Sequence, residues 1–230
     1  VAVGDLLGER LGIPVTVDND ANVALLAERR AGAAQGTAHA VMLTLGTGIG
    51  GAMVVDGRLV RGATGAAGEW GHVVVDLDGP LCRGNCPNRG CLEAVASGTA
   101  LAVEGERAAA TDRESALAKA DAEGRPITGA LVTELAHDGD AASVGAVAAV
   151  GRRLGIGLAS IANALDPEVI VIGGGVIAAG ELLLGPAREE FARRALPPVA
   201  ETVRIEPSRF GAESGMLGAA ILAGAGGGDG

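Results

Sequence analysis

Three cysteines and one histidine have the residue types and the spacing of a metal site. Cys82, Cys86 and Cys91 are the chain's only cysteines, and His72 precedes the first of them by ten residues. The residues between them are rich in Gly, Pro and Asn, which lets the backbone fold around a small ion. We expect a structural Cys3His zinc site with no open coordination position. The alternative is three small buried residues or a free thiol. A redox role is disfavoured because no C-x-x-C occurs.

A glycine-rich segment, "LGTGIGG", has the composition of a phosphate-binding loop. It satisfies G-x-G-x-x-G, but "AMVVDGRLV" follows and alternates like a strand, so we expect a β-hairpin rather than a dinucleotide fold. Glycines let backbone N–H groups approach oxyanions closely, although an ordinary glycine-rich hairpin is the alternative. The candidate nucleotide-binding residues are Gly46, Thr47, Gly48, Gly50 and Gly51 here, and Gly173, Gly174 and Gly175 after a later buried strand.

Polar residues crowd into "DNDAN", between a strand expected at 14–17 and a helix expected at about 22–31. One Asp or Asn is enough to cap a helix, so the surplus points to a function. A carboxylate at the end of a strand can act as general base toward a substrate hydroxyl, and an adjacent amide can hold a neighbouring hydroxyl. The polar residues of this turn are Asp18, Asn19, Asp20 and Asn22.

Two glutamates flank the cysteine loop. Glu69 lies in "GEWGH" and Glu93 in "CLEA". Taken alone, each is as readily a surface residue as a ligand-binding one. A metal-stiffened loop that presents both together with His72 would bind hydroxyl groups, because carboxylates accept hydrogen bonds from sugar OH groups.

The elements around these residues predict an α/β fold. "HAVMLTLGTGIGGAMVVDGRLVRG" predicts three strands joined by hairpins, with an Asp-Gly turn at the second. In open α/β sheets, ligands bind at the carboxyl ends of the strands. The other expected elements are a strand at 72–76, a helix at 141–165 begun by Asp140 and ended by Asp166, a buried strand at 168–172, a helix at 181–195, a strand at 201–207 and a last helix at 213–223.

The amino-acid composition of the chain limits the kinds of molecule that it can bind. The chain has 230 residues, 48% of them hydrophobic, which is enough for a substantial core. Its net charge of −10 argues against nucleic acid, since phosphate binding needs clustered Lys and Arg. The first residues lack the pattern of a signal peptide, and the apolar runs are too short and glycine-rich to span a bilayer. We therefore expect a cytoplasmic protein with neither a nucleic-acid nor a membrane partner.

Taken together, "DNDAN", "LGTGIGGAMVVDGRLVRG", "AGEWGHVVVD" with "DGPLCRGNCPNRGCLE", and "VIVIGGGV" resemble the ROK family (repressors, open reading frames and kinases), most of all its bacterial glucokinases. The resemblance runs from about Val15 to Ala223. It implies the actin-like ATPase (ribonuclease H-like) fold, in which two α/β domains enclose the active site. It also implies transfer of the γ-phosphoryl group of ATP, with Mg²⁺, to a hexose, converting glucose to glucose 6-phosphate.

The resemblance also assigns roles to individual residues. Asp20 matches the family's catalytic base and Asn19 a sugar contact. Glu69, His72 and Glu93 match its sugar ligands, so His72 would serve both the zinc ion and the sugar. The glycine hairpin matches the family's second phosphate loop and Gly173–Gly175 its adenosine loop.

Two departures from the family pattern bear on these expectations. Relatives mostly carry C-x-C-x4-C, whereas the first interval here is x3, so we expect a slightly larger loop with the same four ligands. The family's D-x-G-G-T phosphate loop does not occur before Val15, so we expect an N-terminal part to be missing and turnover to need it. The expected division is 1–37 with 213–223 as the remnant of a small N-terminal α/β domain, 38–212 as a large α/β domain with the zinc loop, and 224–230 as a disordered tail.

Two other functions remain open at this point. One is a sugar-responsive repressor of the same family whose DNA-binding part lies in the missing segment. The other is a zinc-stabilised binding module without nucleotide binding. The intact glycine hairpin and Asp20 favour the enzyme. The resemblance also implies a homo-oligomer, a dimer or a tetramer, but it does not fix which hexose is used, or whether polyphosphate replaces ATP.

Overall fold

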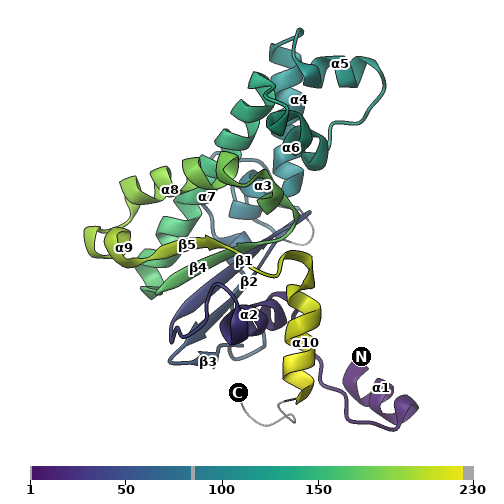
Figure 1. The fold of residues 1–230 in the computed structure, drawn as a ribbon, viewed down its shortest axis with the longest axis vertical. Coiled ribbons are helices and arrows are strands. Elements are labelled where there is room, and N and C mark those ends of the chain that lie inside the picture. Colours follow the sequence, from purple (N-terminus) through teal and green to yellow (C-terminus); the bar gives the residue numbers. More distant parts are fainter. Residues whose placement is uncertain (1, 84–85, 225–230) are drawn as a thin grey trace.

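The computed structural model describes residues 2–83 and 86–224. The expected disordered tail at 224–230 lies, apart from Gly224, outside the described residues. The described part is a mixed α/β structure with one five-stranded sheet, and helices cover both of its faces (Figure 1).

The sheet has the order β3-β2-β1-β4-β5. β1 pairs antiparallel with β2 and parallel with β4. The carboxyl ends of β1 and β4 therefore lie next to each other, at the same end of the two strands. The expected meander is confirmed, because β1, β2 and β3 follow one another through two hairpins. The strands are β1 (Ala40–Leu45), β2 (Ile49–Val55), β3 (Arg58–Leu59), β4 (Val169–Gly173) and β5 (Arg204–Pro207).

The two central strands are buried on both faces, which explains their continuous apolar sequences. Successive side chains point to opposite faces. Leu43 of β1 therefore belongs to a large cluster with α7 (Ala141–Leu165) and α8 (Glu181–Arg194), whereas its neighbour Met42 belongs to a smaller cluster with α2 (Asp20–Ala31).

The remaining helices lie around this core. α4 and α6 pack on α7 and extend away from the sheet with α5 (Figure 1). The remaining helices are α1 (Val3–Leu11), α3 (Leu92–Ala96), α4 (Gly98–Thr111), α5 (Ala116–Ala122), α6 (Gly129–His137), α9 (Pro197–Thr202) and α10 (Ser214–Gly224), with 3-10 turns η1 (Trp70–His72), η2 (Gly175–Ala179) and η3 (Gly211–Glu213).

The long helix α7 was predicted correctly at both ends. The Asp140 side chain accepts hydrogen bonds from the backbone N–H and the hydroxyl of Ser143, and Asp166 ends the helix with a φ of 46°. α7 is long and apolar enough to cross a membrane by length and composition alone. However, 56% of its most apolar window is buried inside the protein, so packing in the core accounts for its apolar character.

Three expected strands differ from the structure. Residues 14–17 belong to no helix or strand, no described strand pairs with them, and Val17 is 61% exposed. His72 ends the 3-10 turn η1 instead of starting a strand, and Val74 forms only an isolated bridge, with Cys91. The strand expected at 201–207 begins three residues later, because Pro197 starts helix α9, which continues through Thr202.

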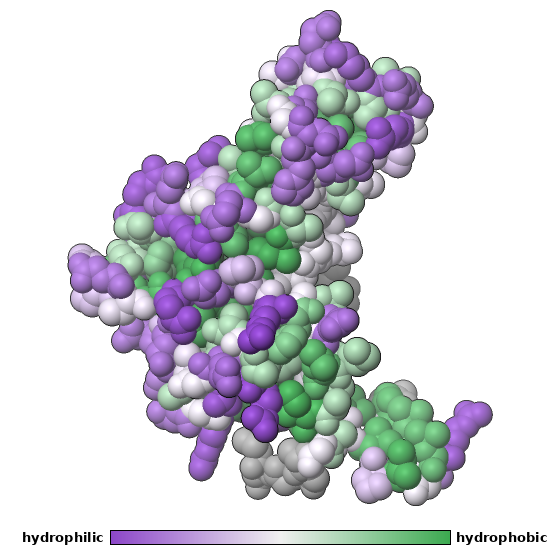
Figure 2. Space-filling view, in the orientation of Figure 1, coloured by the Kyte–Doolittle hydropathy of each residue, from purple (hydrophilic) through white to green (hydrophobic). Residues whose placement is uncertain are grey.

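Helices α2 and α10 pack against each other very closely. A Cβ on Gly218 of α10 would lie 1.6 Å from the carbonyl oxygen of Val23, so only glycine fits at this crossing. α2 also packs on β1 and β2, beneath the strands of 38–212. The division of the chain into 1–37 with 213–223 and 38–212 stays a prediction. Apolar side chains gather over α1 and α10 on the face shown in Figure 2. Leu6 of α1 is 55% exposed.

A buried carboxylate joins α2 to the segment that precedes α10. Glu28 is 0% exposed, and its two oxygens accept hydrogen bonds from the backbone N–H groups of Ala33, Arg209 and Phe210 and from the hydroxyls of Ser208 and Ser214. Burial alone would raise the pKa of Glu28, but these hydrogen bonds outweigh it and lower the pKa below its usual value of 4.5. The charged form is therefore the one that the fold stabilises.

We expect Glu28→Gln to lower the free energy of unfolding by about 2 kcal/mol at pH 7, because an amide NH2 then faces buried N–H donors. A carboxyl with a lowered folded pKa contributes stability that is complete above its unfolded value, 4.5, and is lost as the pH falls through the folded pKa. The difference between Glu28→Gln and the wild type should therefore shrink below pH 4.5. Urea unfolding at several pH values measures it. The exposed Glu189→Gln is the control, and an equal loss for both variants would contradict the prediction.

Candidate functional site

The four expected metal ligands lie together. One ligand atom each from His72, Cys82, Cys86 and Cys91 falls within 4.8 Å of all the others. Cys91 comes directly before α3, and His72 lies at the end of η1. The backbone N–H of Leu92 bonds to the carbonyl of Val73, so the two segments run side by side.

The distances in this cluster fit a zinc ion. A tetrahedral ion with Zn–S bonds of 2.3 Å separates two sulfurs by about 3.8 Å, and a sulfur from an imidazole nitrogen by about 3.5 Å. The Sγ atoms of Cys86 and Cys91 are 3.8 Å apart, and Sγ of Cys82 is 3.5 Å from Nδ1 of His72. The donor set of three sulfurs and one imidazole is also one that zinc prefers.

The thiols of this cluster differ in how readily they ionise. Burial, reinforced by the neighbouring sulfurs of Cys82 and Cys86, raises the pKa of the Cys91 thiol to about 12. A hydrogen bond from the backbone of Asn88 lowers the pKa of Cys86. A bound cation would favour the ionised form of these thiols, because a thiol that coordinates a metal is deprotonated outright.

The two ring nitrogens of His72 face different residues. Nε2 of His72 lies 3.9 Å from a carboxylate oxygen of Glu69, whereas Nδ1 faces Cys82. The imidazole thus stands between the sulfur cluster and an exposed carboxylate. A metal on Nδ1 would fix the tautomer and the direction of Nε2.

Glu93 connects this region to the glycine hairpin. Its Oε2 accepts a hydrogen bond of 2.8 Å from the backbone N–H of Ile49. A Cβ on Gly48 would lie 2.2 Å from the same oxygen, so a side chain there would displace the Glu93 carboxylate. Glycine is required at Gly71, where a Cβ would lie 2.4 Å from the backbone carbonyl oxygen of Ile49. The hairpin, η1 and α3 are therefore packed against one another.

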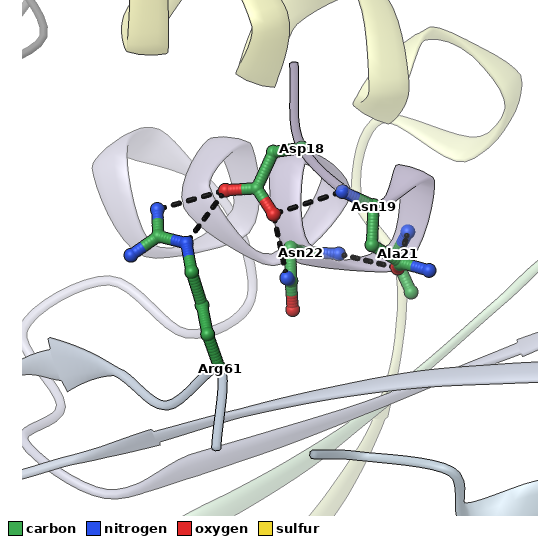
Figure 3. Close-up of polar contacts among 5 residues, drawn as sticks. All are labelled: Asp18, Asn19, Ala21, Asn22 and Arg61. Atoms are coloured by element: carbon green, nitrogen blue, oxygen red, sulfur yellow. Dashed lines mark hydrogen bonds and ion pairs between the residues drawn. The ribbon is translucent and has the colours of Figure 1, made fainter. Parts of the chain in front are cut away.

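The acidic turn forms the start of α2 (Figure 3). Asn19 is the N-cap, and its Oδ1 accepts hydrogen bonds from the backbone N–H groups of Ala21, at 2.9 Å, and Asn22, at 3.3 Å. Asp20 is exposed at the first position of the helix, and its Oδ1 accepts from the N–H of Ala21 at 2.8 Å. A role for Asp20 beyond the start of the helix stays a prediction.

The turn meets the glycine hairpin through small residues. A Cβ on Gly50 would lie 3.7 Å from the Cβ of Ala21, the residue after Asp20. In the described part of the chain, no hydrogen bond or ion pair joins the Asp20 side chain to Glu69, His72 or Glu93. Asp20 lines a cavity of about 810 Å³ that is walled mainly by residues of α1, the segment 14–18 and α10.

A second cavity has a volume of about 690 Å³. Gly46 and Thr47 of the hairpin and Gly175 of the later glycine segment line it, whereas the other predicted nucleotide residues, Gly48, Gly50, Gly51 and Gly173, do not. Gly174 does not line the cavity, but it allows the chain that leaves β4 to pass close to the end of β1. Its φ is 85°, and a Cβ there would lie 2.4 Å from the carbonyl oxygen of Leu45.

Sequence reasoning missed the far wall of this second cavity, which the first turns of α4 and α6 form. The backbone N–H of Gly98 bonds to the carbonyl of Gly46, and the Thr99 hydroxyl to that of Thr47, both at 2.8 Å. Free N–H groups at a helix start attract anions. Two pairs in the sequence could have indicated this wall, Ser97-Gly98 and Thr128-Gly129. In each pair the first residue caps a helix that begins with the glycine.

Similarity to known proteins covers nearly the whole chain. The ROK family profile matches residues 2–225. A glucokinase from Halalkalibacterium halodurans is 40% identical over 219 residues, which are 95% of this chain and 66% of that enzyme. The chain thus spans about two thirds of the length of this relative.

Two solved structures resemble the fold closely. A ROK family glucokinase from Streptomyces griseus, in complex with glucose and AMPPNP, superposes with a TM-score of 0.86 at 37% identity, over 96% of this chain and 71% of that one. A ROK family transcriptional regulator, a homologue of the E. coli MLC protein, gives 0.87 at 32% identity, over 97% of this chain and 55% of that one. The expected actin-like ATPase fold is confirmed by these neighbours, and the chain belongs to the ROK family.

Proposed function

We propose that this protein catalyses the ATP-dependent phosphorylation of a hexose, glucose in the first place. One observation carries the proposal: the glycine hairpin is shared by two candidate ligand surfaces. Its residues Gly46 and Thr47 line the cavity of about 690 Å³, while the N–H of Ile49 is bonded to Glu93, which follows the proposed zinc ligand Cys91 by two residues. The 40% identity to a glucokinase and the fold of one that binds glucose and AMPPNP support this assignment.

In this proposal the residues divide into three groups. Asn19, Glu69, His72 and Glu93 bind hydroxyl groups of the sugar. Asp20 accepts the proton from the attacking hydroxyl, which is the one on carbon 6 of the hexose. Positioning and electrostatic stabilisation supply most of the rate in phosphoryl transfer, so the relative placement of these groups is decisive.

The nucleotide would occupy the cavity of about 690 Å³. Gly46 and Thr47 line this cavity and would offer backbone N–H groups to the phosphates, with Gly48, Gly50 and Gly51 in the same hairpin, and Gly173, Gly174 and Gly175 would leave room for the adenosine. Mg²⁺ would neutralise charge on the transferring phosphate. Zinc would be held by His72, Cys82, Cys86 and Cys91 and would act structurally, by fixing the loop and the His72 ring.

A panel of hexoses tests the proposal. The purified full-length natural protein is incubated with ATP and Mg²⁺. It should release ADP only when a suitable sugar is present. We expect glucose to give the highest kcat/KM among glucose, mannose, fructose, allose and N-acetylated amino sugars. A parallel assay with polyphosphate identifies the donor. No sugar-dependent ADP release with any of these would contradict the proposal.

The similarity to a transcriptional regulator supports a second candidate, a sugar-responsive repressor. In that case the natural protein should bind DNA, release it when the sugar is added, and show no phosphoryl transfer. The same panel, combined with a DNA-binding assay, separates the two functions.

A further inference from the structure

An ion pair between a buried carboxylate and an exposed arginine lies beside the proposed catalytic base and has no role in the function described so far. The Asp18 side chain is 7% exposed, and its Oδ2 accepts hydrogen bonds from Nε of Arg61, at 3.0 Å, and from Nη2, at 2.7 Å (Figure 3). Its Oδ1 accepts from the backbone N–H of Asn19, at 2.8 Å, and from Nδ2 of Asn22, at 2.7 Å. One carboxylate thus holds the residue before Asp20, a residue in the first turn of α2, and a distant arginine.

Asn22 depends on this carboxylate for its orientation. Asn22 is 3% exposed, and its Oδ1 has no hydrogen-bond partner among the described residues. Among the described residues, the bond from Nδ2 to Asp18 is therefore the one hydrogen bond that orients its amide. The hydrogen bonds to Asp18 also outweigh the effect of burial and lower the pKa of its carboxyl.

Arg61 begins the segment that leads to the proposed sugar contacts. Its carbonyl accepts a hydrogen bond of 3.1 Å from the N–H of Ala67, which closes the loop 61–67. The next residue, Gly68, has a φ of 89° and lies against β2, where a Cβ would be 2.8 Å from the carbonyl oxygen of Gly51. Glu69 and His72 follow at once. The side chain of Arg61 therefore ties the start of this segment to the turn that carries Asp20.

We propose that Asp18 and Arg61 are a positioning pair, which sets the place of Asp20 relative to the sugar-binding residues Glu69 and His72. The inference rests on the proposed hexose kinase function. Neither residue needs to touch the substrate. The pair joins the turn that carries Asp20 directly to the segment that carries Glu69 and His72, and a displacement of about 1 Å between reacting groups can cost a hundredfold in rate.

Substitution of either partner tests the inference. In the natural protein, Asp18→Asn and Arg61→Gln should each lower kcat by about tenfold to a hundredfold. The glucose dissociation constant, followed by the fluorescence of Trp70, the chain's one tryptophan, should change much less. The double variant should be no worse than the worse single variant, because the pair acts as a unit. Arg61→Lys, which keeps the charge but loses the two-nitrogen contact, should recover part of kcat.

Arg58→Gln is the matched control, because Arg58 is an exposed arginine of β3 near Arg61. It should keep the wild-type kcat. Wild-type kcat in both Asp18→Asn and Arg61→Gln would overturn the inference. A loss of kcat that follows only from a lower melting temperature or from lost zinc would overturn it as well. A wild type without sugar-dependent turnover would instead overturn the proposed function on which the inference rests.

Discussion

Asp20→Asn should lower kcat for sugar phosphorylation by about 10²- to 10⁴-fold, the usual contribution of a positioned general base. The amide keeps the size of the carboxylate, and its oxygen can still accept the hydrogen bond from the N–H of Ala21. The start of α2 should therefore stay intact, since Asn19 supplies the helix cap. What the variant loses is the group that takes the proton from the attacking hydroxyl.

Two measurements separate this loss from misfolding. Glucose titration by Trp70 fluorescence should give a nearly unchanged dissociation constant, and initial rates of ADP release should give the fall in kcat. Asp56→Asn is the matched control, because Asp56 is an exposed turn residue with a φ of 51°, which asparagine tolerates. A wild-type kcat in Asp20→Asn would remove Asp20 from the role of base.

Cys86→Ser should remove the metal and most of the sugar affinity. We expect about one zinc per wild-type chain and almost none in the variant, because three ligands hold structural zinc far less tightly than four. His72 then loses the metal that fixes its ring, and loss of such an outer contact typically costs 10- to 100-fold, so we expect about that loss of glucose affinity. Cys86 is the best of the three thiols to replace, because it is less buried than Cys82 and Cys91.

Elemental analysis measures the metal, and Trp70 fluorescence measures the sugar affinity. Asp78→Asn, an exposed change in the same loop, should alter neither. Incubation of the wild type with a chelator should reproduce the variant, and added zinc should restore glucose binding to the wild type alone. Zinc-free wild-type protein with full glucose affinity would contradict the coupling of the two sites.

The sequence predicted well those elements whose signals are local. Asp140 and Asp166 bound α7 because a cap and a left-handed residue act within one turn. β4 was recognised because five consecutive buried residues leave a continuous apolar run. The spacing of His72 and the three cysteines indicated their proximity because ligands of one ion must converge.

Elements that depend on distant partners could not be predicted in this way. Residues 72–76 have the composition of a strand, but close packing of Gly71 on Ile49 holds the preceding residues in a 3-10 turn. The glycine starts of α4 and α6 became significant only where the fold placed them beside Gly46. The contact between Arg61 and Asp18 spans 43 positions and left no periodic signal.

The hydrogen bond between Glu93 and Ile49 has a thermodynamic consequence. A hexose that forms hydrogen bonds with Glu93 would change the bond between Glu93 and the N–H of Ile49, and so the hairpin backbone. A phosphate that accepts hydrogen bonds from the hairpin backbone would in turn change the bond that Glu93 receives. Such linkage is reciprocal: whatever factor the sugar applies to nucleotide affinity, the nucleotide must apply to sugar affinity. We therefore expect the two substrates to bind cooperatively rather than independently, with the same coupling factor whichever of them is titrated first.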